Sequence, residues 1–256
     1  MIPYVRQPEY LSPSSFALFE EDPIAYYKAK LGPAEAAVYE PPSVAMRVGS
    51  MFDGMLGCLW RKEGIPEEWK SDEGFPIARK MFFDYVATGG YERLLQLGIV
   101  DMQRELHGFV PETEVPIHGF ADVVTPVGLT PDWKVSNTQA AKPPSPPKGY
   151  AVSVKIKPDG DYEVKQHKDF GMPLDQINER WAIQQAMYQW MLHEDMRPFL
   201  GVLHLMQPNR FTEYQAPVTL DFQYRLRRRL VDAWDKIQQR DVVPKDVCLE
   251  LAMACV

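Results

Sequence analysis

One stretch constrains the fold of this chain more than any other: residues 118–134, HGFADVVTPVGLTPDWK. Across residues 115–124, apolar or small side chains alternate with others such as His118 and Asp122, which is the two-residue period of a half-buried β-strand. Residues 125–128, TPVG, then have the composition of a turn, because proline presets φ and glycine tolerates turn conformations. The pattern predicts a β-hairpin at the centre of the fold.

The predicted hairpin brings two acidic residues together. A loop centred near Val127 would pair residues whose numbers sum to about 254, which sets Asp122 opposite Asp132. Asp132 and Lys134 are two residues apart, so both side chains lie on one face of the strand, while Trp133 lies on the other.

Such a trio predicts phosphodiester hydrolysis. Two neighbouring carboxylates in a partly buried site favour a bound cation, and hard oxygen ligands suit Mg²⁺ or Mn²⁺. A divalent ion would polarise a phosphate, while the lysine would stabilise the nucleophile or the developing negative charge. The alternative interpretation is a solvated charge pair on a strand, since exposed charges are common.

Length and composition fit a globular protein. The chain has 256 residues, 45% of them hydrophobic and 12% aromatic, enough to bury the core of one large domain. Without a long apolar run or a signal-peptide pattern, we expect a cytoplasmic protein with no membrane partner. The three cysteines, Cys58, Cys248 and Cys255, are too scattered for a disulfide framework. A net charge of −7 argues mildly against nucleic-acid binding. A protein whose site consists of carboxylates with a bound metal ion does not, however, need a positive net charge to bind nucleic acid.

A third acidic residue lies on a predicted helix over residues 44–60, where apolar residues recur at steps of three and four. Asp53 lies off this apolar stripe, among Gly49, Gly54 and Gly57. Each glycine costs about 1 kcal/mol in a helix interior. Three of them indicate a face that another backbone, or a phosphate and its metal, approaches closely. Tight helix-to-sheet packing with Asp53 exposed is the alternative.

Two segments are predicted as additions to the central fold. Residues 61–110 are expected to form a helical insert or cap, with helices at roughly 75–87 and 90–106. Residues 135–170 are expected to form a proline-rich loop followed by a second β-hairpin. His118, about 13 Å from Asp122 along a straight strand, is expected to be structural or to face the substrate rather than to be a metal ligand.

A strong helix is predicted over residues 174–193, and its apolar stripe passes over Gln184. A glutamine in that arc is a buried amide that needs partners. With Tyr188 one turn later, it could orient a phosphate or the metal-bound water, and a satisfied core glutamine is the alternative.

Four short motifs occur in order along these elements. They are GSMFD at residues 49–53, GFAD at 119–122, DWK at 132–134 and QQAMY at 184–188. Together they resemble the four-part signature of PD-(D/E)XK nucleases, and most closely that of the RecB-like and lambda-exonuclease-like branch. The opening LSPSSFALFEEDPIAYY also resembles the N-terminal helices of that branch, and the similarity covers most of residues 10–240.

The resemblance implies an α/β fold with a restriction-endonuclease-like core, in which helices flank a central mixed β-sheet. Residues 1–256 would form a single nuclease domain that carries the helical insert and the extra hairpin. The implied activity is Mg²⁺-dependent (or Mn²⁺-dependent) cleavage of DNA, commonly from an end. By position, the resemblance assigns metal binding to Asp122, Asp132 and the Trp133 carbonyl, assistance of the attacking water to Lys134, and support of substrate and site to Gln184 and Tyr188.

The chain departs from the family pattern at two points. Many members have histidine at the position of Asp53, which still offers an oxygen ligand, so Asp53 is expected to bind metal and the number of ions stays open. Some members hold an iron–sulfur cluster on four cysteines, a set that this sequence lacks. No iron–sulfur cluster is therefore expected.

The expected function is that of a metal-dependent deoxyribonuclease, an exonuclease rather than an endonuclease, in recombination, repair or replication. DNA is the expected partner, with a single-strand-annealing protein or a helicase as a further one. Short stand-alone proteins of this type are often phage nucleases, which is an analogy. The alternatives are a non-catalytic DNA-binding or recombination-accessory module on the same fold and a structure-specific endonuclease. Polarity, strand preference, RNA tolerance and oligomeric state stay open.

Overall fold

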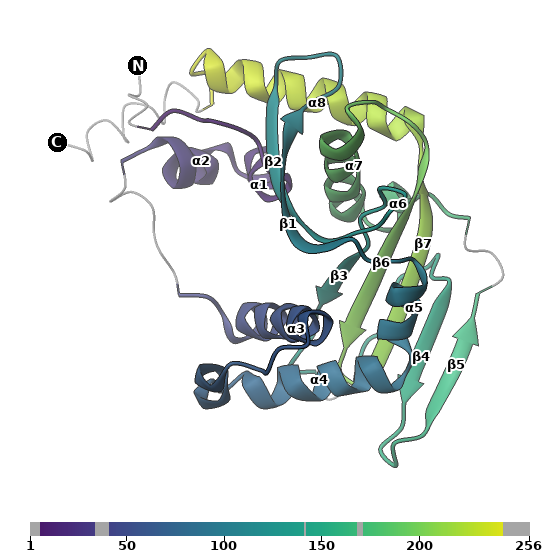
Figure 1. The fold of residues 1–256 in the computed structure, drawn as a ribbon. Helices are drawn as coiled ribbons and strands as arrows, with labels where there is room; N and C mark the ends of the chain where they lie inside the picture. Colours follow the sequence, from purple (N-terminus) through teal and green to yellow (C-terminus); the bar gives the residue numbers. More distant parts are fainter. Residues whose placement is uncertain (1–5, 34–40, 141, 168–170, 243–256) are drawn as a thin grey trace.

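The structure, a computed structural model, describes residues 6–33, 41–140, 142–167 and 171–242. Figure 1 shows the arrangement of its elements. The helices are α1 (Pro13–Glu21), α2 (Pro23–Tyr26), the π-helix η1 (Tyr27–Leu31), α3 (Val44–Arg61), the 3₁₀-helix η3 (Glu67–Ser71), α4 (Phe75–Ala87), α5 (Gly90–Gln96), α6 (Leu174–Ile177), α7 (Glu179–His193) and α8 (Leu220–Gln238). The strands are β1 (Asp101–Phe109), β2 (Pro116–Val124), β3 (Asp132–Val135), β4 (Val152–Ile156), β5 (Tyr162–Gln166), β6 (Phe199–Gln207) and β7 (Arg210–Val218).

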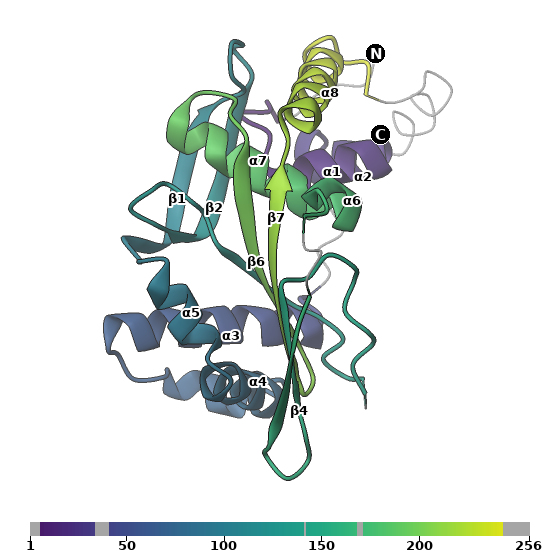
Figure 2. The ribbon, with the colours of Figure 1, turned by 90° about the vertical axis from the view of Figure 1, so that its right-hand side faces the viewer.

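The strands form two sheets. The central sheet has the order β3-β6-β7-β4-β5, with β3 parallel to β6 and the other neighbours antiparallel. Strands β1 and β2 form a separate antiparallel ribbon. Figures 1 and 2 show α7 and α8 toward one end of the long β6–β7 pair and α3 and α4 toward the other. The fold is thus α/β with a mixed central sheet flanked by helices, as the sequence predicted.

Two hydrophobic clusters hold these layers together. Because side chains alternate along a strand, Leu203 and Leu205 of β6 enter the cluster with α1, α7 and α8, while Met206 enters the cluster with α3 and α4. On β7, Tyr214 belongs to the first cluster and Phe211 to the second. The central sheet is therefore covered on both faces.

The glycines of α3 have a packing explanation. A Cβ at Gly54 would lie 2.3 Å from the ring of Trp69, and a Cβ at Gly49 would lie 3.9 Å from Val135 of β3. The first distance is too short for a side chain, so glycine lets η3 pack against α3. The small-residue face thus serves close packing, and Asp53 is brought toward β3 by the approach at Gly49.

The predicted hairpin over residues 118–134 is wrong in its pairing. Strand β2 covers the expected residues, but it pairs with β1, and β3 pairs with β6 in the other sheet. The connecting loop is fixed on α7, where Gln185 and Gln189 donate hydrogen bonds to the carbonyls of Thr130 and Gly128, at 2.8 and 2.6 Å. These contacts direct the chain across to the second sheet instead of back along β2.

The predicted helix at roughly 90–106, in the helical insert or cap of residues 61–110, is wrong in its second half. Helices α4 and α5 are present, but residues 101–109 form β1. Met102 and Leu106, the buried residues here, are four positions apart, a spacing that suits a helix and a strand equally well. Pairing with β2 decides in favour of the strand.

The second hairpin is confirmed as β4 and β5, and it extends the central sheet through the pairing of β4 with β7. Residues 141 and 168–170 of the predicted segment lie outside the described residues. Cys58 is a buried free thiol, while Cys248 and Cys255 also lie outside the described part. None of the described helices combines the length and apolar character that crossing a membrane requires.

A buried polar network joins α4 and α5 to the central sheet. The Tyr85 hydroxyl lies 2.6 Å from Nδ1 of His204, whose Nε2 is 3.7 Å from the Glu213 carboxylate. Arg93 contacts the same carboxylate at 3.4 Å. Burial, and to a lesser degree the charge of Arg93, lowers the pKa of His204 to about 3. The ring is therefore neutral in the folded protein.

This histidine should make stability depend on pH. The pKa of His204 is lower in the folded than in the unfolded chain. The neutral ring therefore favours the folded state fully above about pH 6.5, and this stabilisation is lost as pH falls toward 3. From pH 7 to pH 5 the free energy of unfolding should fall by about 2 kcal/mol more in the wild type than in His204→Gln. Urea titrations across this range measure it. If the free energy of unfolding changed equally with pH in the two proteins, the lowered pKa of His204 would be contradicted.

Candidate active site

Lys134 stands at the centre of a group of polar side chains from β3 and α7. Its Nζ lies 2.6 Å from Oδ2 of Asp132 and 2.8 Å from Oε1 of Gln184. The Gln184 amide in turn donates to Oδ1 of Asp132, at 3.1 Å, and to the Tyr188 hydroxyl, at 2.8 Å. Lys134 and Asp132 project from the same face of β3, and Gln184 and Tyr188 are one turn apart on α7. The structure thus brings four predicted site residues together.

Asp122 contacts this group from β2. Its Oδ2 accepts a hydrogen bond from the Trp133 backbone N–H at 3.1 Å. Burial raises the pKa of Asp122 well above its ordinary value, and the charge of Asp132 and a hydrogen bond between the two carboxyl groups raise it further. The two acids are therefore neighbours as predicted, although β2 and β3 belong to different sheets.

The charge of Lys134 follows from the same neighbours. Burial lowers the pKa of its ammonium group, but the charges of Asp132, Asp122 and Asp53 outweigh this effect, and the pKa is raised overall. Lys134 is a cation at neutral pH. It therefore serves as a donor of charge and hydrogen bonds in this site.

Asp53 is positioned by a residue that the sequence reasoning did not identify. Nε2 of Gln103, on β1, donates to Oδ2 of Asp53 at 2.5 Å. Gln103 has a φ of 56°, which is uncommon for a non-glycine residue in a strand. Oδ1 of Asp53 is buried without a hydrogen-bond partner, and burial raises the pKa of this carboxyl group.

The predicted metal ligands do not all converge. A metal ion needs ligand atoms that lie close together. Among the described residues, the carboxylate oxygens of Asp53, Asp122 and Asp132 do not all lie within 4.8 Å of one another, whereas ligand atoms of another group of residues do. The Trp133 side chain is buried in the cluster with α3. The backbone of Trp133, which pairs with that of His204 in the sheet, lies beside Asp122 and Asp132.

The residues present nevertheless fit a hard divalent cation. An oxygen of Asp53 lacks a hydrogen-bond partner, and the carboxyl groups of Asp53 and Asp122 both have raised pKa values. A buried carboxylate without compensation is costly, and a cation with oxygen ligands compensates it. Carboxylate oxygens are ligands that suit hard cations such as Mg²⁺ and Mn²⁺.

A cleft of about 670 Å³ opens onto this group. The lining includes Lys134, Gln184 and Tyr188, and Lys30 adds positive charge, whereas Arg180 is paired with Glu21 of the same lining at 2.7 Å. The acids are not among the lining residues, so Lys134 and Gln184 stand between them and the cleft. A ligand in this cleft would meet the ammonium group first.

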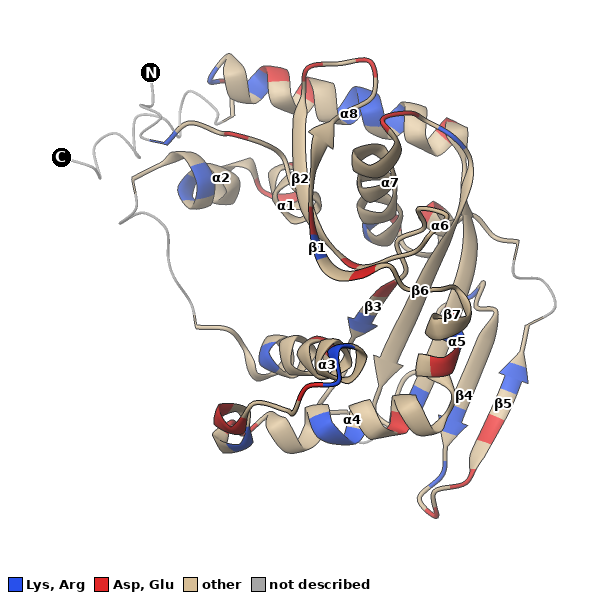
Figure 3. Ribbon diagram, viewed as in Figure 1, with Lys and Arg blue, Asp and Glu red and all other residues tan. Residues whose placement is uncertain are grey.

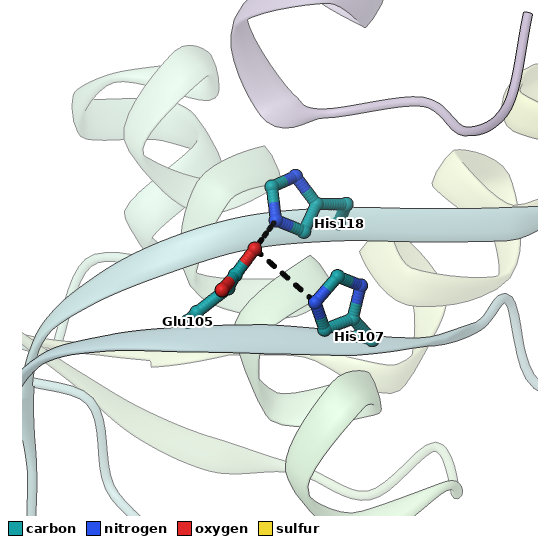
Figure 4. Close-up of side chains that lie close together, drawn as sticks. All are labelled: Glu105, His107 and His118. Atoms are coloured by element: carbon teal, nitrogen blue, oxygen red, sulfur yellow. Dashed lines mark hydrogen bonds and ion pairs between the residues drawn. The ribbon is translucent and has the colours of Figure 1, made fainter.

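The sequence reasoning missed a second group of residues, which Figure 4 shows on the β1–β2 ribbon. Glu105 and His107 on β1 and His118 on β2 could hold a metal ion. His118, expected to be structural or to face substrate, does line the cleft. The signal that could have found the other two is the two-residue spacing of the polar residues Gln103, Glu105 and His107, which the helix prediction obscured.

Comparison with known proteins adds no match: neither a protein-family model nor a curated protein matches this chain. The resemblance of the four motifs to PD-(D/E)XK nucleases therefore stays a prediction. What the chain can do is interpreted from the geometry of this site.

Replacement of Asp122 by asparagine should raise stability and remove a response to magnesium. Since the pKa of Asp122 is raised by folding, its stabilising effect is present below about pH 3.8 and is lost as pH rises through the folded-state value. At pH 7 and without metal, Asp122→Asn should therefore melt at a higher temperature than the wild type. At Mg²⁺ concentrations of about 100 Kd, the wild type should gain roughly 5–10 °C and the variant little.

Thermal melts after treatment with chelator, with and without Mg²⁺, measure both effects. The matched control is Asp159→Asn, which removes a carboxylate in the exposed β4–β5 turn. An equal Mg²⁺ response in Asp122→Asn and Asp159→Asn would mean that the ion binds elsewhere.

Proposed function

We propose that this protein is a metal-dependent deoxyribonuclease of the PD-(D/E)XK superfamily, of the RecB-like and lambda-exonuclease-like branch. It hydrolyses phosphodiester bonds of DNA, from an end, in recombination, repair or replication. Its place of action is the cytoplasm of a bacterial or phage-infected cell. The observation that carries the proposal is the Lys134 ammonium at the cleft wall, 2.6 Å from Asp132 and 2.8 Å from Gln184, with Asp122 against Asp132.

The metal ion of this proposal is Mg²⁺ or Mn²⁺. Asp122, Asp132 and Asp53 would hold it, with the Trp133 carbonyl as a further oxygen ligand. A bound divalent ion polarises the scissile phosphate and lowers the pKa of a water molecule. The protein's own side chains then orient the reactants and stabilise charge.

Lys134 acts as a cation and not as a general base. Its raised pKa keeps a proton on Nζ at neutral pH, so the amine cannot accept one from the attacking water. The ammonium group instead donates hydrogen bonds to that water or to the developing negative charge on the phosphate. Because it is preorganised, it does not need to reorient during the reaction.

Gln184 fixes the orientation of this lysine. Its carbonyl oxygen accepts from Nζ of Lys134, and its amide nitrogen donates to both Asp132 and Tyr188. Tyr188 thereby holds the amide in one of its two orientations, and burial raises the pKa of its phenol. The phenol stays protonated and keeps its place in the network.

The cleft can bind a polyanion despite the net charge of −7. Its lining includes Lys30, Lys134 and Arg180, the last paired with Glu21 of the same lining at 2.7 Å, together with the aromatic rings of Tyr10 and Phe120. Figure 3 shows basic positions at the segment labelled α2 and on β3. Cations bind phosphates and aromatic rings stack with unpaired bases. These features suit an end of DNA.

The second candidate is a DNA-binding or recombination-accessory module without turnover. One observation favours it: the oxygens of Asp53, Asp122 and Asp132 do not lie within 4.8 Å of one another. A structure-specific endonuclease would use the same residues as the proposed exonuclease. An activity assay with linear and circular DNA separates the three.

Incubation of linear duplex DNA with Mg²⁺ or Mn²⁺ should shorten it from its ends, and chelator should stop the reaction. Asp132→Asn and Lys134→Met should each lose activity by about 10²-fold or more, because each removes a charge that the transition state needs. Gel analysis of end-labelled linear DNA and of closed circles measures this.

Asp159→Asn and Lys165→Met are the matched controls, since they remove one acid and one lysine from the β4–β5 hairpin and should stay active. Nicking of closed circles would identify an endonuclease. Retention of DNA on the gel without cleavage, in all the proteins, would support the accessory module and reject the enzyme.

Lys30→Ala should weaken DNA binding regardless of sequence. An exposed lysine at the cleft contributes by neutralising a phosphate, so its loss should reduce the slope of log K against log salt by about 0.9 for duplex DNA. Fluorescence anisotropy in chelator, at several KCl concentrations, gives the slope. Lys165→Ala should leave it unchanged, and an equal effect of both variants would place the DNA outside the cleft.

A further inference from the structure

The β1–β2 ribbon carries a group of metal-ligand type that the proposed reaction does not use. Nε2 of His118 lies 2.9 Å from Oε1 of Glu105, and Nε2 of His107 lies 3.3 Å from the same oxygen. Figure 4 shows both rings directed toward this carboxylate, from two neighbouring strands. We propose that Glu105, His107 and His118 form a site for a divalent transition-metal ion of the zinc class.

The spacing of the three ligand atoms fits one ion. Zinc ligands stand about 2.1 Å from the metal, so two ligands at tetrahedral positions are about 3.4 Å apart. The two distances between Glu105 and the histidines are 2.9 and 3.3 Å, and all three atoms lie within 4.8 Å of one another. Small side-chain rotations are enough to place an ion between them.

The strand register explains how these residues meet. His107 is the direct partner of His118 in the antiparallel pair, and Glu105 is two residues along the same strand, so all three lie on one face of the ribbon. Their geometry is set by the backbone pairing. It does not depend on a mobile loop.

Neighbouring rings fix the orientation of His118. It is buried, its ring centroid lies 4.4 Å from that of Tyr10 and 5.1 Å from that of Phe120, and His107 packs against it at 4.5 Å. Its backbone N–H donates to the Leu11 carbonyl at 3.0 Å. A ligand whose rotamer is locked by packing loses little entropy on metal binding.

The ligand types select the ion. Two imidazole nitrogens and one carboxylate suit Zn²⁺ and its neighbours in the first transition series, whereas Mg²⁺ prefers oxygen ligands. Three protein ligands leave a fourth position for water or an anionic oxygen. Glu105 and His107 are exposed, so an ion can enter from solvent.

This site is separate from the carboxylate group around Lys134. His118 and Asp122 share a face of β2 but are four residues apart, which is about 13 Å along a strand. One ion cannot bind both groups. The proposal therefore stands or fails independently of the proposed nuclease activity.

Co²⁺ serves as the probe, because its visible absorption reports coordination by nitrogen and oxygen ligands. In the full chain, freed of metal by a chelator and dialysed, the intense bands typical of tetrahedral or five-coordinate Co²⁺ should saturate at one equivalent. One equivalent of Zn²⁺ should abolish the bands, and a millimolar excess of Mg²⁺ should leave them. His107→Ala, His118→Ala and Glu105→Ala should each weaken Co²⁺ binding more than about 10-fold.

His107→Ala is the decisive variant, because the exposed side chain can be removed without disturbing the core, as circular dichroism would verify. Asp132→Asn, which alters the carboxylate group, should retain the Co²⁺ spectrum. The spectrum should also persist in His193→Ala, a histidine on α7. Equal Co²⁺ affinity in the wild type and His107→Ala would overturn the proposal, as would a spectrum lost in Asp132→Asn.

Discussion

The contact between the Lys134 ammonium and the Asp132 carboxylate is the interaction on which the rest of the site depends. Asp132 is almost completely buried, at 1% exposure, and such a charge needs a partner. Lys134 provides it from the same strand, Gln184 holds both from α7, and Asp122 adds a second carboxyl group from β2. Elements from the ribbon, the central sheet and a helix are thus tied to one ion pair. The geometry that stabilises the charge also directs the ammonium group to the cleft.

The sequence predicted the local structure around this contact well, because local structure depends on local patterns. The alternation over residues 115–124 specified β2, and the apolar stripes specified α3 and α7. The sequence also predicted that Asp122 and Asp132 lie close together, although it paired their two strands incorrectly. Both acids lie at the ends of strands that meet through the loop 125–131, so they are close whether the strands form a hairpin or diverge into two sheets. Hydrogen bonds from Gln185 and Gln189 to that loop decide between the two, and no periodicity in the sequence reveals them.

The site residues that the sequence did not single out, Gln103, Glu105 and His107, all lie on β1. Met102 and Leu106 satisfy the spacing of a helix as well as that of a strand, and only the pairing with β2 distinguishes them. Once β1 is a strand, Gln103, Glu105 and His107 share a face with Asp122 and His118. The partner of Asp53 and two ligands of the proposed metal site thus follow from one long-range contact. A pattern within one segment cannot contain that information.

The polar group around Lys134 lies at the boundary of the two hydrophobic clusters. Tyr188 belongs to the cluster with α7, whereas Trp133 and the apolar residues of α3 that position Asp53 belong to the other. Local opening of the first cluster would separate Gln184 and Tyr188 of α7 from the ion pair on β3, and opening of the second would separate Asp53 of α3 from it. The site is complete only when both hydrophobic clusters are folded. Under the proposed function, a partly folded chain would hold only part of the site and would not cleave DNA.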